Sequence, residues 1–299
     1  MTTSTQAFGR TDPTTNKPVR LNRLIDLLAS GQGAVGTFVP NGDEERLFAL
    51  ADSPYDFVVI EMETGGFDFP TLRASLRCLL DRGAILRGGT LQPKPTPLVR
   101  VPFNGKEVAQ WIVKQALNEG AYGLMLPQMN NAGDLDKAVR AARYPQLRDA
   151  EDIEPRGERG WPAQRAARYW GLPIADYTRV ADVWPLDAQG ELVLMPLIEE
   201  EEAVHNIREL VRVPGVTAFF IGEGDLSTSL GYPANPDAPA VQEAVREVLA
   251  VCKEAGVPAA SIPRPGKIEQ RVQDGCTILF VAPGLSFSAA EQGLKALGR

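Results

Sequence analysis

Eight short apolar runs constrain the fold of this 299-residue chain more than any other sequence feature. Each run has the length of a β-strand, and most are nearly continuous in apolar character, which is typical of strands covered on both faces. Stretches with the periodicity of amphipathic helices separate the runs. The runs span residues 33–40, 56–63, 97–102, 122–129, 191–198, 218–225, 257–263 and 276–283.

The clearest helical stretches lie at residues 71–82, 106–119, 134–143, 241–254 and 267–274. Eight regularly spaced strand-and-helix units favour an α/β fold of the (β/α)8 type, a TIM barrel, over a doubly wound sheet, which seldom needs eight strands. We therefore expect residues 21–299 to form one barrel domain. A polar, loosely held N-terminal tail over residues 1–20 should precede it.

Two connections are long for barrel loops, residues 84–96 and residues 144–190. The second one is an insertion rich in arginine and aromatic side chains. Loops of this length are often functional. The sequence therefore predicts that this insertion forms a lid or an assembly surface over the mouth of the barrel.

The chain contains a single histidine, His205, among 38 acidic and 31 basic residues. One imidazole excludes sites that need two, such as a zinc site with a histidine pair, so a bound metal must have oxygen ligands.

The net charge of −7 argues against binding to nucleic acid or to an anionic membrane. No apolar run approaches the roughly 20 residues that span a bilayer. The three cysteines are far apart in the sequence and the N-terminal segment is polar, so we expect the protein to be located in the cytoplasm.

Polar residues close several of the predicted strands, and reactive groups of barrels lie at the C-terminal ends of strands. Glu199 and Asp225 end neighbouring strands, which lie about 4.8 Å apart, so their carboxylates can hold one cation. Two other interpretations remain open, because Glu199 begins an acidic run that suits a helix start and Asp225 can cap the next helix. The other strand-closing candidates are Glu63, Thr64, Arg100 and Gln128.

Arg100 lies within the apolar run 97–102, where a guanidinium is costly to bury without an anion. It either pairs with Glu61 or Glu63 or binds a substrate carboxylate. His205 follows Glu199 in a helical pattern, so we expect it on the outer shell of the barrel rather than in catalysis.

Several of these residues fall in stretches that resemble the HpcH/HpaI aldolase family, the metal-dependent pyruvate aldolases related to the citrate lyase β-subunit. The resemblance covers nearly the whole predicted barrel, from about residue 33 to residue 294. The stretches that carry it are DFVVIEME (56–63), PLVRVP (97–102), GLMLPQ (123–128), ARYP (142–145), FIGEGDLS (220–227) and GYP (231–233).

The resemblance implies a barrel that exchanges its last helix with a neighbour in a homo-oligomer, a trimer or a hexamer. It also implies a divalent metal, Mg²⁺ or Mn²⁺, held by Glu199 and Asp225. In such a site the metal binds a 2-oxo acid and stabilises the pyruvate-type enolate released by carbon–carbon cleavage. The residues that match the substrate-binding positions are Arg100, Gln128, Gly224 and Asp225.

The sequence departs from the family where proton transfer takes place. Thr64 stands in place of the catalytic histidine, and Asn118 in place of its aspartate partner. Leu197 replaces a frequent glutamine near the keto oxygen, and Glu223 replaces a usual proline. Thr64 cannot act as a base near neutral pH, so the proton must go to a metal-bound water, to Glu63 or to Glu223.

Three functions remain open from the sequence. The first is a lyase that cleaves a 2-oxo acid by a retro-aldol reaction or by decarboxylation, which needs no base to start. The second is a different enolate reaction, such as a synthase or hydrolase step, with residues 144–190 selecting a larger or aromatic substrate. The third is a non-catalytic barrel that only binds metal and keto acid. The catalytic candidates are Arg100, Glu63, Thr64 and Glu223.

Overall fold

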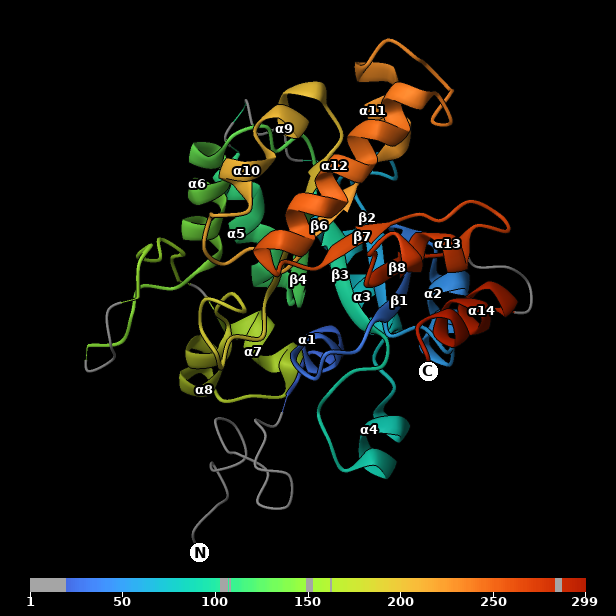
Figure 1. Cartoon of the computed structure of the whole chain (residues 1–299). Coiled ribbons are helices and arrows are strands. Elements are labelled where there is room, and N and C mark those ends of the chain that lie inside the picture. Colours follow the sequence, from blue (N-terminus) through green and yellow to red (C-terminus); the bar gives the residue numbers. More distant parts are fainter. Residues whose placement is uncertain (1–19, 103–106, 108, 149–152, 162, 283–286) are drawn as a thin grey trace, which may run out of the picture.

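The structure of the chain is a computed structural model that describes residues 20–102, 107, 109–148, 153–161, 163–282 and 287–299. Eight parallel strands pair in sequence order, and β8 pairs with β1, so the sheet closes into a barrel (Figure 1). The predicted (β/α)8 fold is confirmed. The strands are β1 (Ala34–Pro40), β2 (Phe57–Glu61), β3 (Thr96–Arg100), β4 (Gly123–Leu126), β5 (Val193–Ile198), β6 (Phe219–Ile221), β7 (Ala259–Ser261) and β8 (Ile278–Phe280).

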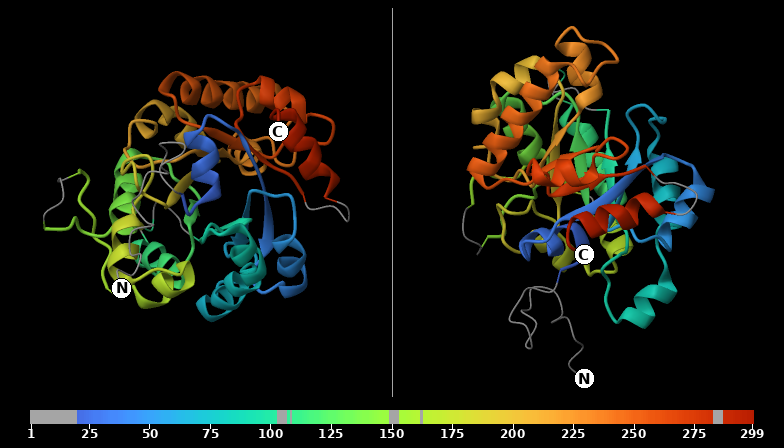
Figure 2. Two further views of the ribbon diagram at one scale, coloured as in Figure 1. Left: turned by 90° about the horizontal axis from the view of Figure 1, so that it is seen from below. Right: turned by 45° about the vertical axis from the view of Figure 1, so that its right-hand side comes forward.

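Helices surround the barrel, and none in the described part of the chain is long and apolar enough to cross a membrane (Figure 2). In chain order they are α1 (Arg23–Ala29), α2 (Glu44–Ala51), α3 (Phe69–Cys78), α4 (Arg82–Gly88), α5 (Gln110–Glu119), α6 (Ala132–Ala142), α7 (Gln164–Trp170), α8 (Ile174–Val180), α9 (Glu201–His205), α10 (Ile207–Leu210), α11 (Glu223–Ser229), α12 (Pro239–Ala255), α13 (Ile268–Gln273) and α14 (Ser288–Ala296).

Each predicted apolar run contains the core of one strand, but several runs extend past the end of their strand. The run 218–225 contains only β6, which ends at Ile221, so Asp225 lies in the first turn of α11 instead of closing a strand. The run 56–63 continues past Glu61, the last residue of β2. An apolar run records burial, whereas a strand also needs a hydrogen-bonded neighbour. The residues beyond these strands form the mouth of the barrel.

Four phenylalanines, Phe38, Phe57, Phe220 and Phe280, pack together inside the barrel. The ring centroid of Phe280 lies 4.8 Å from that of Phe38 and 5.1 Å from that of Phe57. Gly36 of β1 makes room for them, because a Cβ at this position would lie 2.2 Å from the Phe57 ring. The Arg100 guanidinium lies over the Phe38 ring, 5.0 Å from its centroid. The packed core therefore supports a charged side chain at the mouth.

The described residues of the predicted insertion, 144–148, 153–161 and 163–190, lie at the end of the barrel opposite to the mouth. The insertion follows α6 and precedes β5, so the chain has already returned to the N-terminal ends of the strands where it begins. Figure 1 shows its helices, α7 and α8, far from α9 and α11, and α4 of the 84–96 connection lies at the same end. Trp170 stacks on Tyr122, just before β4, with 4.0 Å between ring centroids. The prediction of a lid over the mouth is therefore wrong for the described part of this insertion.

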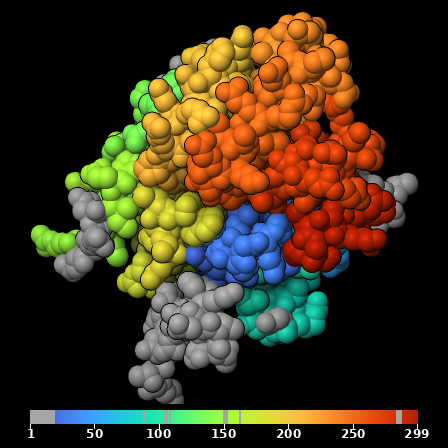
Figure 3. All heavy atoms as spheres, viewed as in Figure 1, coloured from blue at the N-terminus to red at the C-terminus, as the bar shows by residue number. Residues whose placement is uncertain are grey.

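The last helix, α14, packs on the barrel of its own chain. A Cβ at Gly293 would come within 3.1 Å of the Val35 side chain on β1. After the helix, the Arg299 guanidinium pairs with both oxygens of the fully buried Asp56, at 2.6 and 2.9 Å, and Arg23 of α1 binds the same carboxylate at 2.9 Å. Figure 3 shows this red C-terminal segment beside the blue N-terminal one. In this single chain α14 covers β1 itself, and the helix exchange that the resemblance implies stays a prediction.

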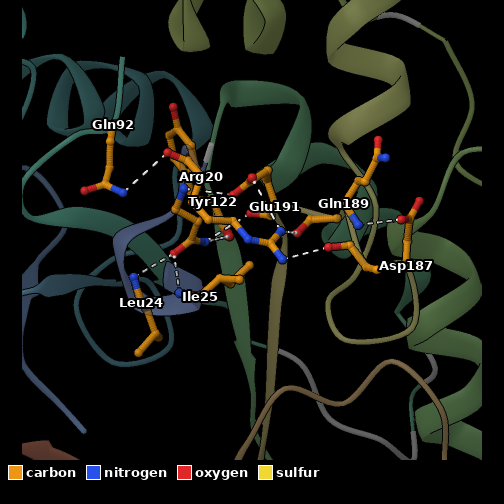
Figure 4. A network of polar contacts seen from close by, with 11 residues as sticks. Arg20, Leu24, Ile25, Gln92, Tyr122, Asp187, Gln189 and Glu191 are labelled. Carbon is orange, nitrogen blue, oxygen red and sulfur yellow. Dashed lines mark hydrogen bonds and ion pairs between the residues drawn. The ribbon is translucent and has the colours of Figure 1, made fainter. Parts of the chain in front are cut away.

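A buried ion pair ties the segment before α1 to the start of β5 (Figure 4). The Arg20 guanidinium donates to the main-chain oxygens of Gly190 at 3.0 Å and Ala188 at 2.7 Å, and it lies 3.6 Å from Oε1 of Glu191. Oε2 of Glu191 accepts the N–H of Asn22 at 2.9 Å. Burial raises the pKa of Glu191 to about 7, against the opposing effect of Arg20.

This raised pKa predicts a loss of stability as the pH increases. The ordinary pKa is 4.5, so between about pH 4.5 and 7 the folded chain keeps a proton on Glu191 that the unfolded chain has lost. The contribution of this group to the free energy of unfolding decreases over that range by about 3 kcal/mol. Glu191→Gln cannot titrate. Denaturant unfolding at several pH values should therefore show the wild type losing stability relative to this variant, whereas parallel profiles would contradict the shift.

Candidate active site

A cavity of about 540 Å³ opens at the C-terminal ends of the strands. The last residue of β3, the segments that follow β2, β4 and β5, and α11 supply its walls. It brings together most of the predicted site residues, which are Glu63, Thr64, Arg100, Gln128, Glu199 and Asp225. The other residues that line it are Glu200, Thr228 and Ser229.

Glu199 is the most buried carboxylate of this cavity, with 4% of its surface exposed. Its Oε1 accepts the N–H of Gln128 at 2.8 Å, and Gln128 has a left-handed backbone with φ of 55°. Gly222 passes close on the other side, where a Cβ would lie 3.0 Å from Oε2. Burial raises the pKa of Glu199 to about 7, the Gln128 N–H opposes this, and Glu63 and Asp225 raise it further. The three carboxylates are thus close enough to repel one another.

Arg100 forms the ion pairs that the sequence left as one of two alternatives. Its Nε lies 2.5 Å from Oε2 of Glu61 and 3.2 Å from Oε2 of Glu63. Oε1 of Glu61 accepts the N–H groups of Glu63 at 2.7 Å and Thr64 at 3.2 Å. Glu61 therefore orients both the arginine and the loop after β2. It was missed as a site residue, although an acidic residue inside an apolar strand was a usable signal.

Glu63 and Thr64 line the cavity side by side, but the position matched to the family aspartate is far from them. Burial raises the pKa of Glu63, Arg100 lowers it, and Glu61 and Asp225 raise it. Asn118 lies in the last turn of α5, at the opposite end of the barrel. There its Oδ1 accepts two hydrogen bonds from Arg159, at 3.1 and 3.0 Å.

Glu223 does not face the cavity, contrary to the expectation that it shares a side with Asp225. Its Oε1 lies 2.8 Å from Arg271 of α13. Its Oε2 accepts hydrogen bonds from Gln242 at 3.1 Å and Arg264 at 3.3 Å. These bonds turn the carboxylate toward α12 and α13, so the prediction that Glu223 faces the same side as Asp225 is wrong.

Three other residues from the sequence analysis do not line the cavity. Gly224 has its carbonyl hydrogen-bonded to the Ser227 hydroxyl at 2.7 Å, within α11. Leu197 is fully buried in β5. His205 ends α9 on the exposed outer shell, as predicted.

The sequence matches the family model described as HpcH/HpaI aldolase/citrate lyase over residues 34–277. This chain belongs to the HpcH/HpaI aldolase/citrate lyase family. A 4-hydroxy-2-oxo-heptane-1,7-dioate aldolase of Klebsiella pneumoniae is 30% identical over 279 residues, 92% of each chain. A hydroxypyruvate/pyruvate aldolase of Pseudomonas aeruginosa is 28% identical over 93% of this chain and 91% of its own. A solved family member from Burkholderia cenocepacia J2315 superposes with a TM-score of 0.73 at 27% identity, covering 93% of this chain and 100% of that one.

The cavity of this HpcH/HpaI family member has a donor set that suits a hard divalent cation. Among the described lining residues, Arg100 is the one cation and Glu63, Glu199, Glu200 and Asp225 are acidic, so the local charge is negative. Glu61, behind the lining, pairs with the same arginine. In the described part of the chain, no three His, Cys, Asp or Glu side chains form a closed metal site. Mg²⁺ is usually held by one or two carboxylates, and water and substrate take its other positions. Glu199 and Asp225 fit that requirement.

The ion pairs of Glu223 predict a structural role that a substitution can separate from catalysis. Glu223→Gln should lower the free energy of unfolding by about 2 kcal/mol, because two arginines lose their buried partner. Turnover should stay within about threefold of wild type, because the side chain faces away from the cavity. Glu243→Gln, an exposed change on α12, is the matched control. A hundredfold loss of turnover with unchanged stability would instead assign Glu223 to catalysis.

Proposed function

We propose that this chain is a divalent-metal-dependent carbon–carbon lyase that acts on a 2-oxo acid, by retro-aldol cleavage or by decarboxylation. The observation that carries the proposal is the meeting of Glu199, Asp225 and Arg100 at one cavity in a chain of this family. The two aldolase relatives, whose names contain a 4-hydroxy-2-oxo acid and pyruvate, support the substrate class.

Glu199 and Asp225 are the residues that would hold the metal. Oε1 of Glu199 is engaged by the Gln128 N–H at 2.8 Å, so Oε2 is the oxygen available to a cation. Asp225 is exposed in the first turn of α11 and lines the same cavity. When bound, Mg²⁺ or Mn²⁺ supplies a Lewis acid for the negative charge that develops on the keto oxygen.

Arg100 is suited to the carboxylate of the substrate. Phe38 supports the guanidinium from below, and Glu61 fixes its direction through a bond of 2.5 Å to Nε. A planar guanidinium matches the geometry of a carboxylate. Because the protein orients the Arg100 side chain before the substrate arrives, this side chain loses less conformational freedom when the substrate binds.

Glu63 is the proton acceptor that we propose for retro-aldol cleavage. The hydroxyl of Thr64 is not a base near neutral pH, and the carboxylate of Glu223 is paired with Arg264 and Arg271. Glu63 lines the cavity, and burial raises its pKa, which makes its carboxylate a stronger base. It would remove the proton of the 4-hydroxyl group as the C3–C4 bond breaks, releasing an aldehyde while the electron pair passes to C3. Decarboxylation breaks the equivalent bond with loss of CO₂ and needs no base.

The alternative of a larger or aromatic substrate loses its main support. It depended on the insertion at residues 144–190, and no described residue of that insertion lines the cavity. The third alternative is a barrel that binds metal and 2-oxo acid without catalysing a reaction. The turnover assay described next distinguishes it from a lyase.

The test is pyruvate release from a series of 4-hydroxy-2-oxo acids, followed with lactate dehydrogenase and NADH. We expect release with Mg²⁺ or Mn²⁺ and none with EDTA. A protein that binds Mn²⁺ and oxalate but releases no pyruvate from any of these acids, or from oxaloacetate, would contradict the proposal and indicate a non-catalytic barrel.

A further inference from the structure

A second cavity, of about 420 Å³, lies on the side of the barrel and is separate from the mouth. Residues of α3, α5, α7 and the start of α4 line it, and the view from below in Figure 2 shows the cyan helices beside the yellow-green α7. Its described lining carries five arginines and one glutamate, a net charge of +4 in a chain whose overall charge is −7. The lining residues are Arg73, Arg77, Leu80, Arg82, Glu119, Arg165, Arg168 and Tyr169.

Glu119, at the end of α5, organises two of these arginines. Its carboxylate is 8% exposed and binds Arg73 through two hydrogen bonds, of 2.6 Å from Nε and 3.0 Å from Nη2. Its Oε1 also accepts a hydrogen bond of 3.0 Å from Arg165. One carboxylate thus holds guanidinium groups from both walls, and a guanidinium bound on one edge still presents donors on the other. Glu119 therefore fixes one edge of Arg73 and links it to Arg165, whose side chain is 65% exposed.

Arg77, Arg82 and Arg168 complete the cavity without a carboxylate of their own. Among the described residues, the guanidinium groups of these three arginines have no hydrogen bond or ion pair. Arg77 lies one turn after Arg73 on α3, and Arg168 one turn after Arg165 on α7, so like charges are neighbours along each helix. Such neighbours repel each other and cost each helix a few tenths of a kcal/mol. An anion between the two walls would remove that repulsion.

Tyr169 joins the two walls of this cavity. Its hydroxyl, on α7, donates to the main-chain oxygen of Leu76, on α3, at 2.7 Å. The aromatic ring and Leu80 give the cavity an apolar part next to its charged rim. The arrangement combines guanidinium groups, which match phosphate and carboxylate oxygens in pairs, with a packed connection that holds their helices together.

We propose that this arginine cavity binds a small polyanion, a molecule with at least two phosphate or carboxylate groups. Its volume fits a small molecule, and its charge is opposite to that of the metal cavity. It is therefore a second binding site, independent of the proposed lyase reaction.

The test is calorimetric titration of the full-length protein, without divalent metal, with pyrophosphate in one arm and 1,2,3-propanetricarboxylate in the other. We expect saturable binding of at least one probe, weakened by added salt. The arm that binds more tightly identifies the anion as phosphate or carboxylate. Arg77→Gln combined with Arg168→Gln should weaken this binding by at least about tenfold, since two charge-assisted contacts are lost.

A matched control carries the same charge change elsewhere. Arg179→Gln with Arg212→Gln alters two exposed arginines outside the cavity and should change the affinity by less than about twofold. The proposal fails if neither probe saturates, or if both double variants lose binding equally. It also fails if the Arg77/Arg168 variant changes its oligomeric state in analytical ultracentrifugation together with its loss of binding, because the arginines would then serve a protein contact.

Discussion

Asp225→Asn is expected to reduce metal-dependent cleavage of a 2-oxo acid by at least about a thousandfold. The substitution keeps the size of the side chain but removes one of the two carboxylates that would hold the metal. Loss of the Lewis acid at the keto oxygen costs several kcal/mol of transition-state stabilisation, and about 4 kcal/mol corresponds to that factor. Initial rates of pyruvate release at saturating Mn²⁺ measure the effect.

The binding of the metal itself gives an independent readout for this variant. Titration of free Mn²⁺ by electron paramagnetic resonance should show a large loss of affinity in Asp225→Asn. Glu202→Gln, an exposed change in the first turn of α9, makes the same charge change outside the cavity and should behave as wild type. Wild-type Mn²⁺ affinity in Asp225→Asn would show that the metal ligands lie elsewhere.

Glu63→Gln is expected to separate the two cleavage reactions. If Glu63 accepts the proton, retro-aldol cleavage should decrease by about 10²- to 10⁴-fold, the usual range for removal of a general base. Decarboxylation of oxaloacetate should decrease by less than about tenfold, because no proton needs to be removed before the carbon–carbon bond breaks. Parallel measurements of the two reactions on the same preparation give this ratio directly.

Thr64→Val controls for a general disturbance of the same loop. It replaces the neighbouring cavity residue with one of similar size, and both reactions should stay within about threefold of wild type because Thr64 takes no proton. An equal loss of both reactions in Glu63→Gln would contradict its role as a base and indicate that it only positions Arg100, whose Nε lies 3.2 Å away.

Local sequence patterns were sufficient for the strands and for most of the candidate cavity. Strands covered on both faces are continuous in apolar character, and the residues that follow them meet at one end of a closed barrel. This is why Arg100, Gln128 and Glu199, which come from different strands, could be grouped before the structure was known. The exact end of β6 could not be predicted, since it depends on hydrogen bonds to its neighbours, and Asp225 was therefore assigned to a strand instead of to α11.

The features that the sequence did not predict depend mostly on contacts between distant parts of the chain. The orientation of Glu223 depends on Gln242, Arg264 and Arg271, which belong to later units of the barrel and have no signal near residue 223. The position of the insertion at residues 144–190, in contrast, was open to prediction, because a segment between a helix and the next strand lies at the N-terminal ends of the strands. The pairing of Arg299 with Asp56, which lies just before β2, spans 243 residues of sequence and has no local pattern that predicts it.

The most direct test of the central claim is the release of pyruvate from oxaloacetate in the presence of Mn²⁺. With wild-type protein, pyruvate should be released faster than with the same concentration of free Mn²⁺ alone. With Asp225→Asn, the rate of pyruvate release should fall to the rate of free Mn²⁺. Equal rates for wild type, Asp225→Asn and free Mn²⁺ would contradict a metal-dependent 2-oxo acid lyase at this cavity.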